Sequence, residues 1–565
     1  MIRASRYLFA AVLSTLVSCA MFISAERPGS PKIDGLGNHT WTITTRSPEA
    51  QALFNQGVGL FYAFDHSDAA RSFRAALEAD PACAMCAWGL AYATGPNVNN
   101  NNPADRKESA RFQARAEKLA KDVSPLELAI INAASGRYVS VNKKDEEPSE
   151  PVAKICTSST TKIAPAFDLA YAQKMAAVYK QFPADPDVAT LYADAELIAD
   201  AWKWWNAEGK PTAATERGVA ALEGVLKNNR EHTGANHLLI HALEQSRTPE
   251  RAIASADLLR SLAGGAPHLL HMPSHIYIKT GRFADATLAN QTALLADDKR
   301  EEIVKAQGFE ARPSWRPHHL HFLQYAAMMD GRSEISINAS IKLAVLSSGK
   351  SARGGERSGV YSQYMHSLAR LNQARFQQWD AIIAAPAATV KGGIEEGLAH
   401  YTRGLAQVAR GSVAEAEVEL TEIRRLAAID KNRKAKLFGE YEISSLLQIA
   451  AEALDGQLKL KSQKTVDGIE ALQRAVKLES ALHADDPPLL GAHTRLMLGR
   501  VLLSVGRNAE AETVAREDLK AIPGSGWALA MLRDALRAQK KIAEAIAVEK
   551  TLNEVWARAD AALKS

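Results

Sequence analysis

The chain has 565 residues, of which 47% are hydrophobic and 23% are charged. A single compact core cannot organise this length, so several domains or an elongated repeat array are expected. The formal net charge of +4 is close to neutral and gives no support to nucleic-acid binding or to a polybasic membrane surface. We therefore expect no nucleic-acid partner.

The N-terminus has the pattern of an export signal. Two arginines precede residues 7–24, which carry no charge, as in a secretory signal peptide. The residues before Cys19 resemble a bacterial lipobox, which would leave a lipidated Cys19 at the mature N-terminus. Cleavage after Ala25 and an uncleaved anchor are the alternatives. We expect residues 1–25 to be a signal peptide or lipoprotein signal, the protein to be exported and periplasmic or envelope-associated, and membrane contact to occur only through that lipid or anchor.

Cysteine is too scarce for a disulfide framework, since only Cys19, Cys83, Cys86 and Cys156 occur. Cys83 and Cys86 form a C-x-x-C motif, but Ala87 follows where covalent haem attachment would require histidine. In an oxidising compartment the pair could be a disulfide or a redox pair. Two small buried residues on a helix are the third interpretation.

A helical repeat begins near Glu49. Its small, aromatic and proline positions are Gly57, Ala69, Phe73, Ala76 and Pro81. This pattern resembles the tetratricopeptide repeat family, in which small residues let two helices approach and a proline ends the second helix. The signature returns in residues 233–266, 267–299, 317 onward, 397 onward and 492–523. The resemblance covers most of residues 50–565 and implies an all-α, right-handed α-solenoid.

The repeat predicts a domain order along the chain. After an N-terminal linker at 26–49, we expect tetratricopeptide-like repeats with insertions at 50–232. His-rich central units follow at 233–345, and further repeats at 346–565. The segments GANHLLIHALE and HLLHMPSHIYIKTGRF also resemble an exported bacterial subgroup of this family that has no settled activity.

Histidine is concentrated in the central units. Nine of the fifteen histidines lie between His232 and His321. The interval from His237 to His271 is 34 residues, and so is that from His241 to His275, which is a helical-repeat period. Residues three or four apart share a helix face. The histidines are therefore expected in rows across three first helices, on the face that the family resemblance assigns to a concave groove.

The pattern suits a transition metal. Imidazoles at i and i+4 with a carboxylate on the next turn are a common ligand set, and His237, His241 and Glu244 have this spacing. Neighbouring helices lie roughly 10 Å apart, so ligands from two units can meet. We predict a mononuclear or dinuclear zinc, copper or iron centre, although Pro273 could kink the helix that carries two of the ligands. The candidate ligands are His237, His241, Glu244, His268, His271, His275, His318 and His321. His319 falls outside this register.

Two functions follow. One is a scaffold that binds a protein or peptide ligand in its concave groove, with the histidine site at its centre. The other is a metal-binding protein or a metal-dependent enzyme. The chain lacks the H-E-x-x-H and G-x-S-x-G motifs, and whether it is an enzyme is left open. A histidine face closed to solvent would favour a purely structural core. Trp202 and its neighbours are expected to be core, or a wall of the same site.

Overall fold

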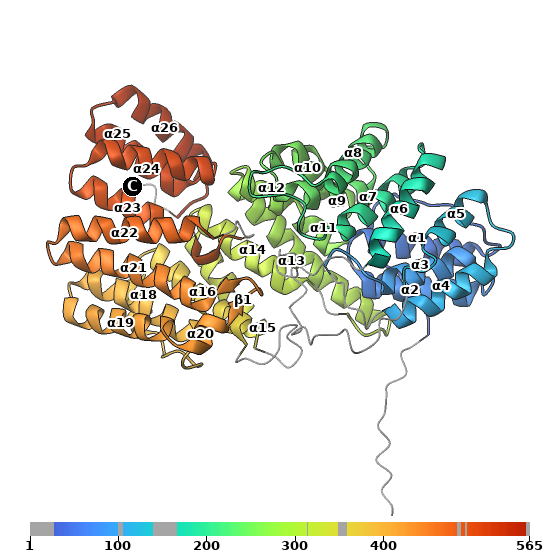
Figure 1. Ribbon diagram of the computed structural model, residues 1–565, viewed down its shortest axis with the longest axis horizontal. Helices are drawn as coiled ribbons and strands as arrows, with labels where there is room; N and C mark the ends of the chain where they lie inside the picture. Colours follow the sequence, from blue (N-terminus) through green and yellow to red (C-terminus); the bar gives the residue numbers. More distant parts are fainter. Residues whose placement is uncertain are drawn as a thin grey trace, which may run out of the picture.

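The computed structural model describes residues 28–99, 106–138, 166–312, 315–348, 359–482, 487–491 and 494–560. Over these residues the protein is built almost entirely of helices, so the predicted all-α solenoid fold is confirmed. Figure 1 shows an elongated molecule with one lobe of N-terminal and central helices and a second lobe of C-terminal helices. The expected export signal at residues 1–25, with Cys19, lies outside the described residues. None of the described helices is long and apolar enough to cross a membrane.

The N-terminal and central helices pack mainly against their neighbours in sequence, as stacked helix pairs do. Their bounds are α1 (Pro48–Tyr62), α2 (His66–Ala79), α3 (Ala84–Thr94), α4 (Arg106–Leu119), α5 (Pro125–Ala133), α6 (Ala166–Gln181), α7 (Pro186–Ala199), α8 (Ala213–Asn228), α9 (Thr233–Glu244), η3 (Pro249–Ala252), α10 (Ile253–Leu262), α11 (Pro267–His271), α12 (Pro273–Lys279), α13 (Phe283–Ala306), α14 (Arg316–Met329) and α15 (Ser333–Leu346). One contact joins distant segments, since α1 lies against α9.

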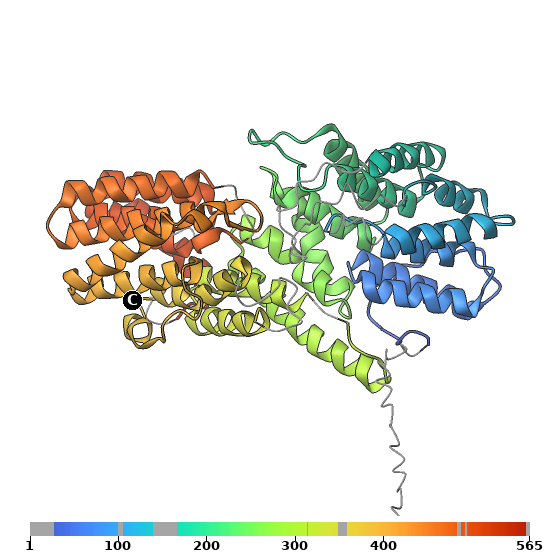
Figure 2. The ribbon, with the colours of Figure 1, turned by 60° about the horizontal axis from the view of Figure 1, so that its bottom comes forward.

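The C-terminal lobe continues the array. Its elements are α16 (Val360–Arg375), α17 (Trp379–Ala384), α18 (Ile394–Arg410), α19 (Val413–Ala427), α20 (Asp430–Lys434), β1 (Lys436–Leu437), β2 (Tyr441–Glu442), α21 (Ile443–Lys461), α22 (Thr465–Ser480), η4 (Leu489–Gly491), α23 (Thr494–Ser504), α24 (Asn508–Ala521), α25 (Gly526–Ala538) and α26 (Ile542–Val555). β1 and β2 form one antiparallel pair, with Lys436 opposite Glu442. Figure 2 shows these helices stacked as successive layers.

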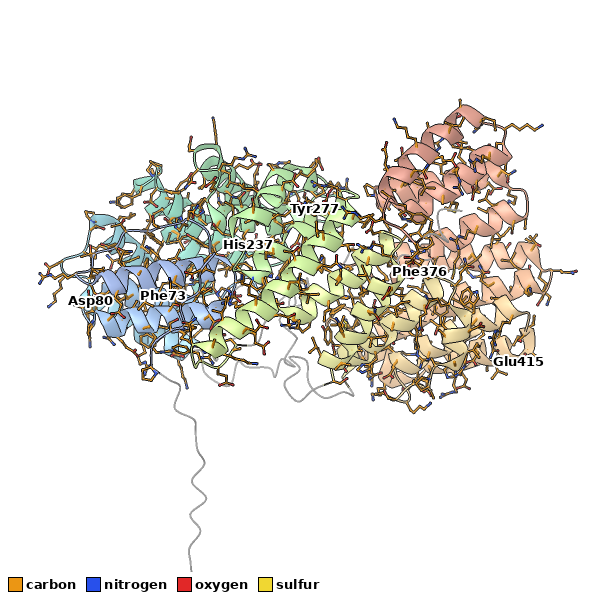
Figure 3. The ribbon with its side chains drawn as sticks, turned by 180° about the vertical axis from the view of Figure 1, so that it is seen from behind. Phe73, Asp80, His237, Tyr277, Phe376 and Glu415 are labelled. Carbon is orange, nitrogen blue, oxygen red and sulfur yellow. A yellow bond between two sulfur atoms is a disulfide. The ribbon has the colours of Figure 1, made fainter. Side chains whose placement is uncertain are left out.

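Phe73 of α2 shows why the repeat requires small residues. A Cβ atom on Gly57 of α1 would lie 2.6 Å from the Phe73 ring, and one on Gly89 of α3 would lie 2.7 Å from it. No side chain fits at such distances, so two glycines allow three helices to close on one buried ring. Phe73 is labelled in Figure 3.

The segment before α1 packs onto the repeats over its described residues, whereas the sequence predicted a linker at 26–49. Ile33, Leu36, Trp41 and Ile43 are buried, and Gly35 accepts a backbone hydrogen bond from Gly265. Ser47 then caps α1 by accepting a hydrogen bond from the Ala50 amide. Four buried apolar side chains thus anchor a segment that contains no helix.

The C-x-x-C motif lies at the start of α3. Cys83 and Cys86 are joined by a disulfide, with their Cα atoms 5.3 Å apart, and both residues are buried. Of the three interpretations of the motif, the structure contains the disulfide.

The last repeat unit packs against the end of a central helix. The indole N–H of Trp527 donates to the Met328 carbonyl at 3.1 Å, and that of Trp556 donates to the Met329 carbonyl at 3.0 Å. The ring of Phe376, labelled in Figure 3, packs 5.6 Å from the Trp527 ring. Because both carbonyls belong to the last turn of α14, the C-terminal lobe is fixed to the end of that helix.

Candidate metal centre

Seven histidines meet in the interior where α9, α11, α12 and α14 pack together. We call them the histidine cluster: His237, His241, His268, His271, His275, His318 and His319. None of them is more than 3% exposed. Figure 3 shows His237 where the N-terminal helices meet the central ones. The family resemblance predicted that the histidines line an open groove. They instead form a closed polar interior.

Six members of the cluster form two groups of three. The first triad is His237, His241 and His268, and the second triad is His271, His275 and His318. In each triad one ring nitrogen from every residue lies within 4.8 Å of the other two. In the second triad the Nε2 atom of His275 is 3.0 Å from that of His271 and 3.4 Å from that of His318. Two nitrogens on one tetrahedral ion, each about 2.0–2.1 Å from it, are about 3.3 Å apart.

The proline within the second helical segment preserves this geometry. α11 ends at His271 and α12 begins at Pro273, but Met272 between them keeps helical dihedral angles (φ −48°, ψ −38°). The chain therefore continues in one direction through the break, although proline cannot donate a backbone hydrogen bond. His271 and His275 remain one turn apart and face the same interior.

Glu244 fixes two imidazoles, one from each triad. Its Oε1 atom is 3.0 Å from Nδ1 of His241, and its Oε2 atom contacts Nδ1 of His275. Burial alone would raise the pKa of Glu244, but the adjacent His275 and His241 outweigh it and hold that pKa below its usual range. An ionised carboxylate only accepts, so both Nδ1 atoms carry the proton. In the neutral rings both Nε2 atoms are then left with a lone pair.

Asn290 on α13 fixes a third imidazole. Its Nδ2 group donates to the Ala286 carbonyl at 2.8 Å, which turns its Oδ1 atom toward Nδ1 of His271 at 2.6 Å. His271 must donate in that contact, so its Nε2 atom also carries a lone pair. The Nε2 atoms of His271 and His275 thus direct two lone pairs at each other across 3.0 Å. That arrangement is repulsive unless a cation or an added proton lies between them.

Two further rings are oriented in the same way. Nδ1 of His237 lies 2.6 Å from the Tyr62 carbonyl at the end of α1, and Nδ1 of His319 lies 2.9 Å from the carboxylate of Asp297 on α13. Both acceptors require the proton on Nδ1. The Nε2 atoms of His237, His241 and His319 make no hydrogen bond within the described part of the chain. Such partners on the opposite ring nitrogen are typical of imidazoles that bind metals.

Burial favours the neutral form of four imidazoles in the cluster. Burial, with a smaller contribution from neighbouring imidazoles, lowers the pKa of His237, His268, His271 and His318 well below the usual value. Neutral imidazole is the form that binds a metal ion. These four imidazoles can therefore bind a cation without first releasing a proton.

Aromatic side chains surround the cluster. The Phe64 ring is stacked 5.2 Å from that of His241, Trp202 lies 6.0 Å from the same ring, and Trp315 is stacked 4.9 Å from His268. Phe322 lies 4.3 Å from His275. Phe64 and Trp202 adopt positive φ angles of 57° and 61°, which side chains of this size seldom adopt. Backbone strain of this kind concentrates at functional sites. Trp202 is a buried core residue, as one of the two interpretations expected, and its ring lies beside that of His241.

A third group of possible ligands is satisfied by its own hydrogen bonds. Asp187 accepts a hydrogen bond from Tyr62 at 2.7 Å, and Nε2 of His39 lies 2.9 Å from the same oxygen. Nδ1 of His232 accepts the Ala235 amide at the start of α9, so its proton is on Nε2, 3.4 Å from Asp187. In this group the carboxylate of Asp187 faces N–H groups, and no lone pairs converge on one point. The arrangement is that of a structural hydrogen-bond network.

Seven of the eight candidate ligands lie in this interior. Six are the histidines of the two triads, and the seventh, Glu244, contacts two of these histidines. His321 belongs to neither triad. Its ring lies near Phe438, and burial lowers its pKa to about 4. His319, which was outside the predicted register, points into the cluster with its ring 4.8 Å from that of His271. Tyr62, Phe64, Asn290 and Asp297 had no sequence signal of their own.

Comparisons with known proteins give no family and no curated relative, since no family model and no curated protein matches the chain. Several solved structures match with low overall similarity. The TPR domain of P58(IPK) is 11% identical, with 87% of this chain and 98% of that chain covered, at a TM-score of 0.23. Yeast Tom70 is 14% identical, with coverage of 89% and 99% and a TM-score of 0.31. The human IFIT1 dimer with PPP-AAAA is 11% identical, with coverage of 88% and 89% and a TM-score of 0.29.

Proposed function

We propose that this protein binds a pair of transition-metal ions, one in each triad of the histidine cluster. The observation that carries the proposal is the close approach of the Nε2 atoms of His271 and His275, which lie 3.0 Å apart and each have a partner on the opposite ring nitrogen. A core of hydrogen-bonded histidines would pair a donor with an acceptor at that distance. A cation would relieve the repulsion between two acceptors, and the two triads together offer six ring nitrogens for two cations.

The ligand set favours zinc, copper or iron. All six nitrogens belong to imidazoles, which bind these metals well, whereas magnesium and calcium require oxygen ligands. Three protein ligands leave a tetrahedral ion one open position, as in catalytic rather than purely structural zinc sites. Glu244 and Asp297 compensate part of the charge that the ions would bring into the interior. These ions would supply Lewis-acid or redox chemistry, and the chain's own residues would orient the ligands and exclude bulk water.

The proposal is tested by elemental analysis of the folded, natively purified protein, followed by titration of the chelator-treated protein with zinc, copper(I) and iron(II). We expect about two ions per chain for one of these metals. The double variant His241→Ala/His275→Ala removes one ligand from each triad and should retain neither ion. Circular dichroism of the variant checks that its helices form. Metal content near zero with no saturable uptake, or full retention by the folded double variant, would refute the proposal.

We also propose that the protein is exported by residues 1–25 and acts in the periplasm or at the cell envelope, with lipid attachment at Cys19 as one form. Support comes from the basic, apolar and small-residue order of this segment. Mass measurement of the mature N-terminus after expression in a bacterial host distinguishes the forms. A chain that still begins at Met1 and remains in the cytoplasm would contradict export.

A peptide-binding scaffold is the second candidate function. It is favoured by the stacked helix pairs, since the inward-facing surface of such an array is where a solenoid can hold a partner. The buried histidine cluster could not contact a peptide on that surface. Loss of metal ligands should therefore leave peptide binding unchanged.

A further inference from the structure

A cavity of about 340 Å³ lies between α16, α18, α21 and α23. Its wall is mainly apolar and includes Leu371, Leu405, Val408, Met497 and Val501. The volume is at the lower end of the roughly 300–1,000 Å³ range of small-molecule sites. It therefore suits a small ligand with an apolar body better than a folded partner.

Two arginines line this cavity without a carboxylate partner. Arg375 is 7% exposed, and its Nη2 group donates to the Gly491 carbonyl at 3.0 Å. Its buried Nε–H group has no hydrogen-bond acceptor within the described residues. Arg500 is exposed at the edge of the cavity. Across the described ranges, neither guanidinium lies within 4.0 Å of a carboxylate oxygen, although most arginines of this chain do so.

Both guanidiniums are held near one aromatic ring. The Cζ atom of Arg375 lies 5.1 Å from the centre of the Trp527 ring, and that of Arg500 lies 5.9 Å from it. Burial, reinforced by Arg500, lowers the pKa of Arg375 to about 10. Two cations kept close together in a partly desolvated wall would be stabilised by an anion.

The acids that act on Arg375 at longer range already have other partners. Asp518 lies 3.5 Å from Arg495, and Glu479 accepts a hydrogen bond from the Thr494 amide at 3.1 Å. Asp534, which acts on Arg500 at longer range, lies 2.8 Å from Arg533. The positive charge at the edge of the cavity is left for a ligand that comes from outside the chain.

We propose that this cavity binds a small amphipathic monocarboxylate, such as a medium-chain fatty acid. The carboxylate would pair with Arg375 and Arg500, since guanidinium forks match carboxylate oxygens in geometry as well as charge. The hydrocarbon tail would lie against Leu405, Met497 and their apolar neighbours, where its burial drives binding. The inference is independent of the metal centre, which lies in the other lobe.

Isothermal titration calorimetry of the full chain with decanoate tests this assignment, with decanol and decyltrimethylammonium as neutral and cationic controls of the same tail length. We expect one saturable site for decanoate, and at least tenfold weaker binding of both controls because they cannot pair with the guanidiniums. Equal affinity for decanol, or no saturable binding of decanoate, would overturn the proposal.

Two variants locate the site. Arg500→Gln removes the exposed guanidinium without disturbing the core, and it should weaken decanoate binding about tenfold. Leu405→Trp fills the cavity and should abolish binding. The matched control is Arg516→Gln on α24, where Arg516 already pairs with Glu512 and Glu544. Unchanged decanoate affinity in Arg500→Gln, or in a folded Leu405→Trp variant, would contradict the assignment.

Discussion

His275 presents its Nδ1 atom to the carboxylate of Glu244 across the junction between two repeat units. The same carboxylate accepts a hydrogen bond from His241, which belongs to the other triad. A single anion therefore sets the ring orientation in both halves of the proposed metal centre. Few side chains outside the triads have this double role, which makes Glu244 the most informative residue to change.

Glu244→Gln should weaken the binding of both metal ions together. The amide keeps the shape but loses the charge, and its NH₂ group would face one of two N–H donors. Loss of such a supporting partner typically costs 10- to 100-fold in metal affinity, and we expect that loss at both ions in competition titrations against a chromogenic chelator. Glu419→Gln is the matched control, since Glu419 is a buried carboxylate bound to His400 far from the cluster. A loss confined to one ion would contradict the shared role.

His318→Ala and His321→Ala should differ sharply although both residues are buried on α14. His318 belongs to the second triad, so its removal should reduce bound metal from about two ions per chain to about one. His321 faces Phe438 and belongs to neither triad, so its removal should leave the metal content unchanged. Elemental analysis of both purified variants provides the comparison. Equal metal loss in the two variants would show that His321 is also a metal ligand.

Asp330→Asn should stabilise the protein, and more so in alkaline solution. Burial raises the pKa of Asp330 to about 7, and neither carboxylate oxygen accepts a hydrogen bond within the described residues. In the unfolded chain an aspartate has a pKa of about 3.9. The folded state therefore holds a proton that the unfolded state releases, and stability falls as pH rises from about 4 to about 7.

The neutral asparagine removes this dependence. The gain in unfolding free energy of Asp330→Asn over the parent should be roughly 2–3 kcal/mol larger at pH 8 than at pH 5. Urea denaturation of both proteins at the two pH values measures that difference. A gain of the same size at both values would show that Asp330 does not retain its proton in the folded protein.

Asp168→Ala should be strongly destabilising because it removes the buried carboxylate that two buried guanidiniums contact. Asp168 lies 2.7 Å from Arg106 and 3.2 Å from Arg137, and all three side chains are fully buried. Removal of one partner from a buried ion pair typically costs about 3–5 kcal/mol. Thermal unfolding is the measurement, with Glu510→Gln, at an exposed ion pair on α24, as a control that should not shift the midpoint.

The spacing of the histidines predicted most of the site because repeat units stack in register. Residues 34 apart occupy equivalent places on neighbouring helices, which is why His241 and His275 meet. Register alone does not give the rotation of each helix about its axis. For this reason it failed on α14, where His319 faces the cluster and His321 does not.

The supporting residues could not be predicted in the same way. Tyr62 ends α1 and Phe64 lies in the turn after it, and Tyr62 is 175 residues from His237 in the sequence. No local pattern encodes that approach, and the positive φ angle of Phe64 leaves no trace in the residue order. The helical fold itself needed only local signals, such as the glycines that accommodate Phe73.

The two indole contacts at the end of α14 change how the whole array should respond to loss of structure. A simple solenoid frays unit by unit from its ends, because each unit touches only its neighbours. Here Trp527 and Trp556 join the final unit to carbonyls 199 and 227 residues earlier in the chain. The C-terminal end cannot detach without exposing the helix that carries His318, so terminal fraying becomes coupled to the integrity of the histidine cluster.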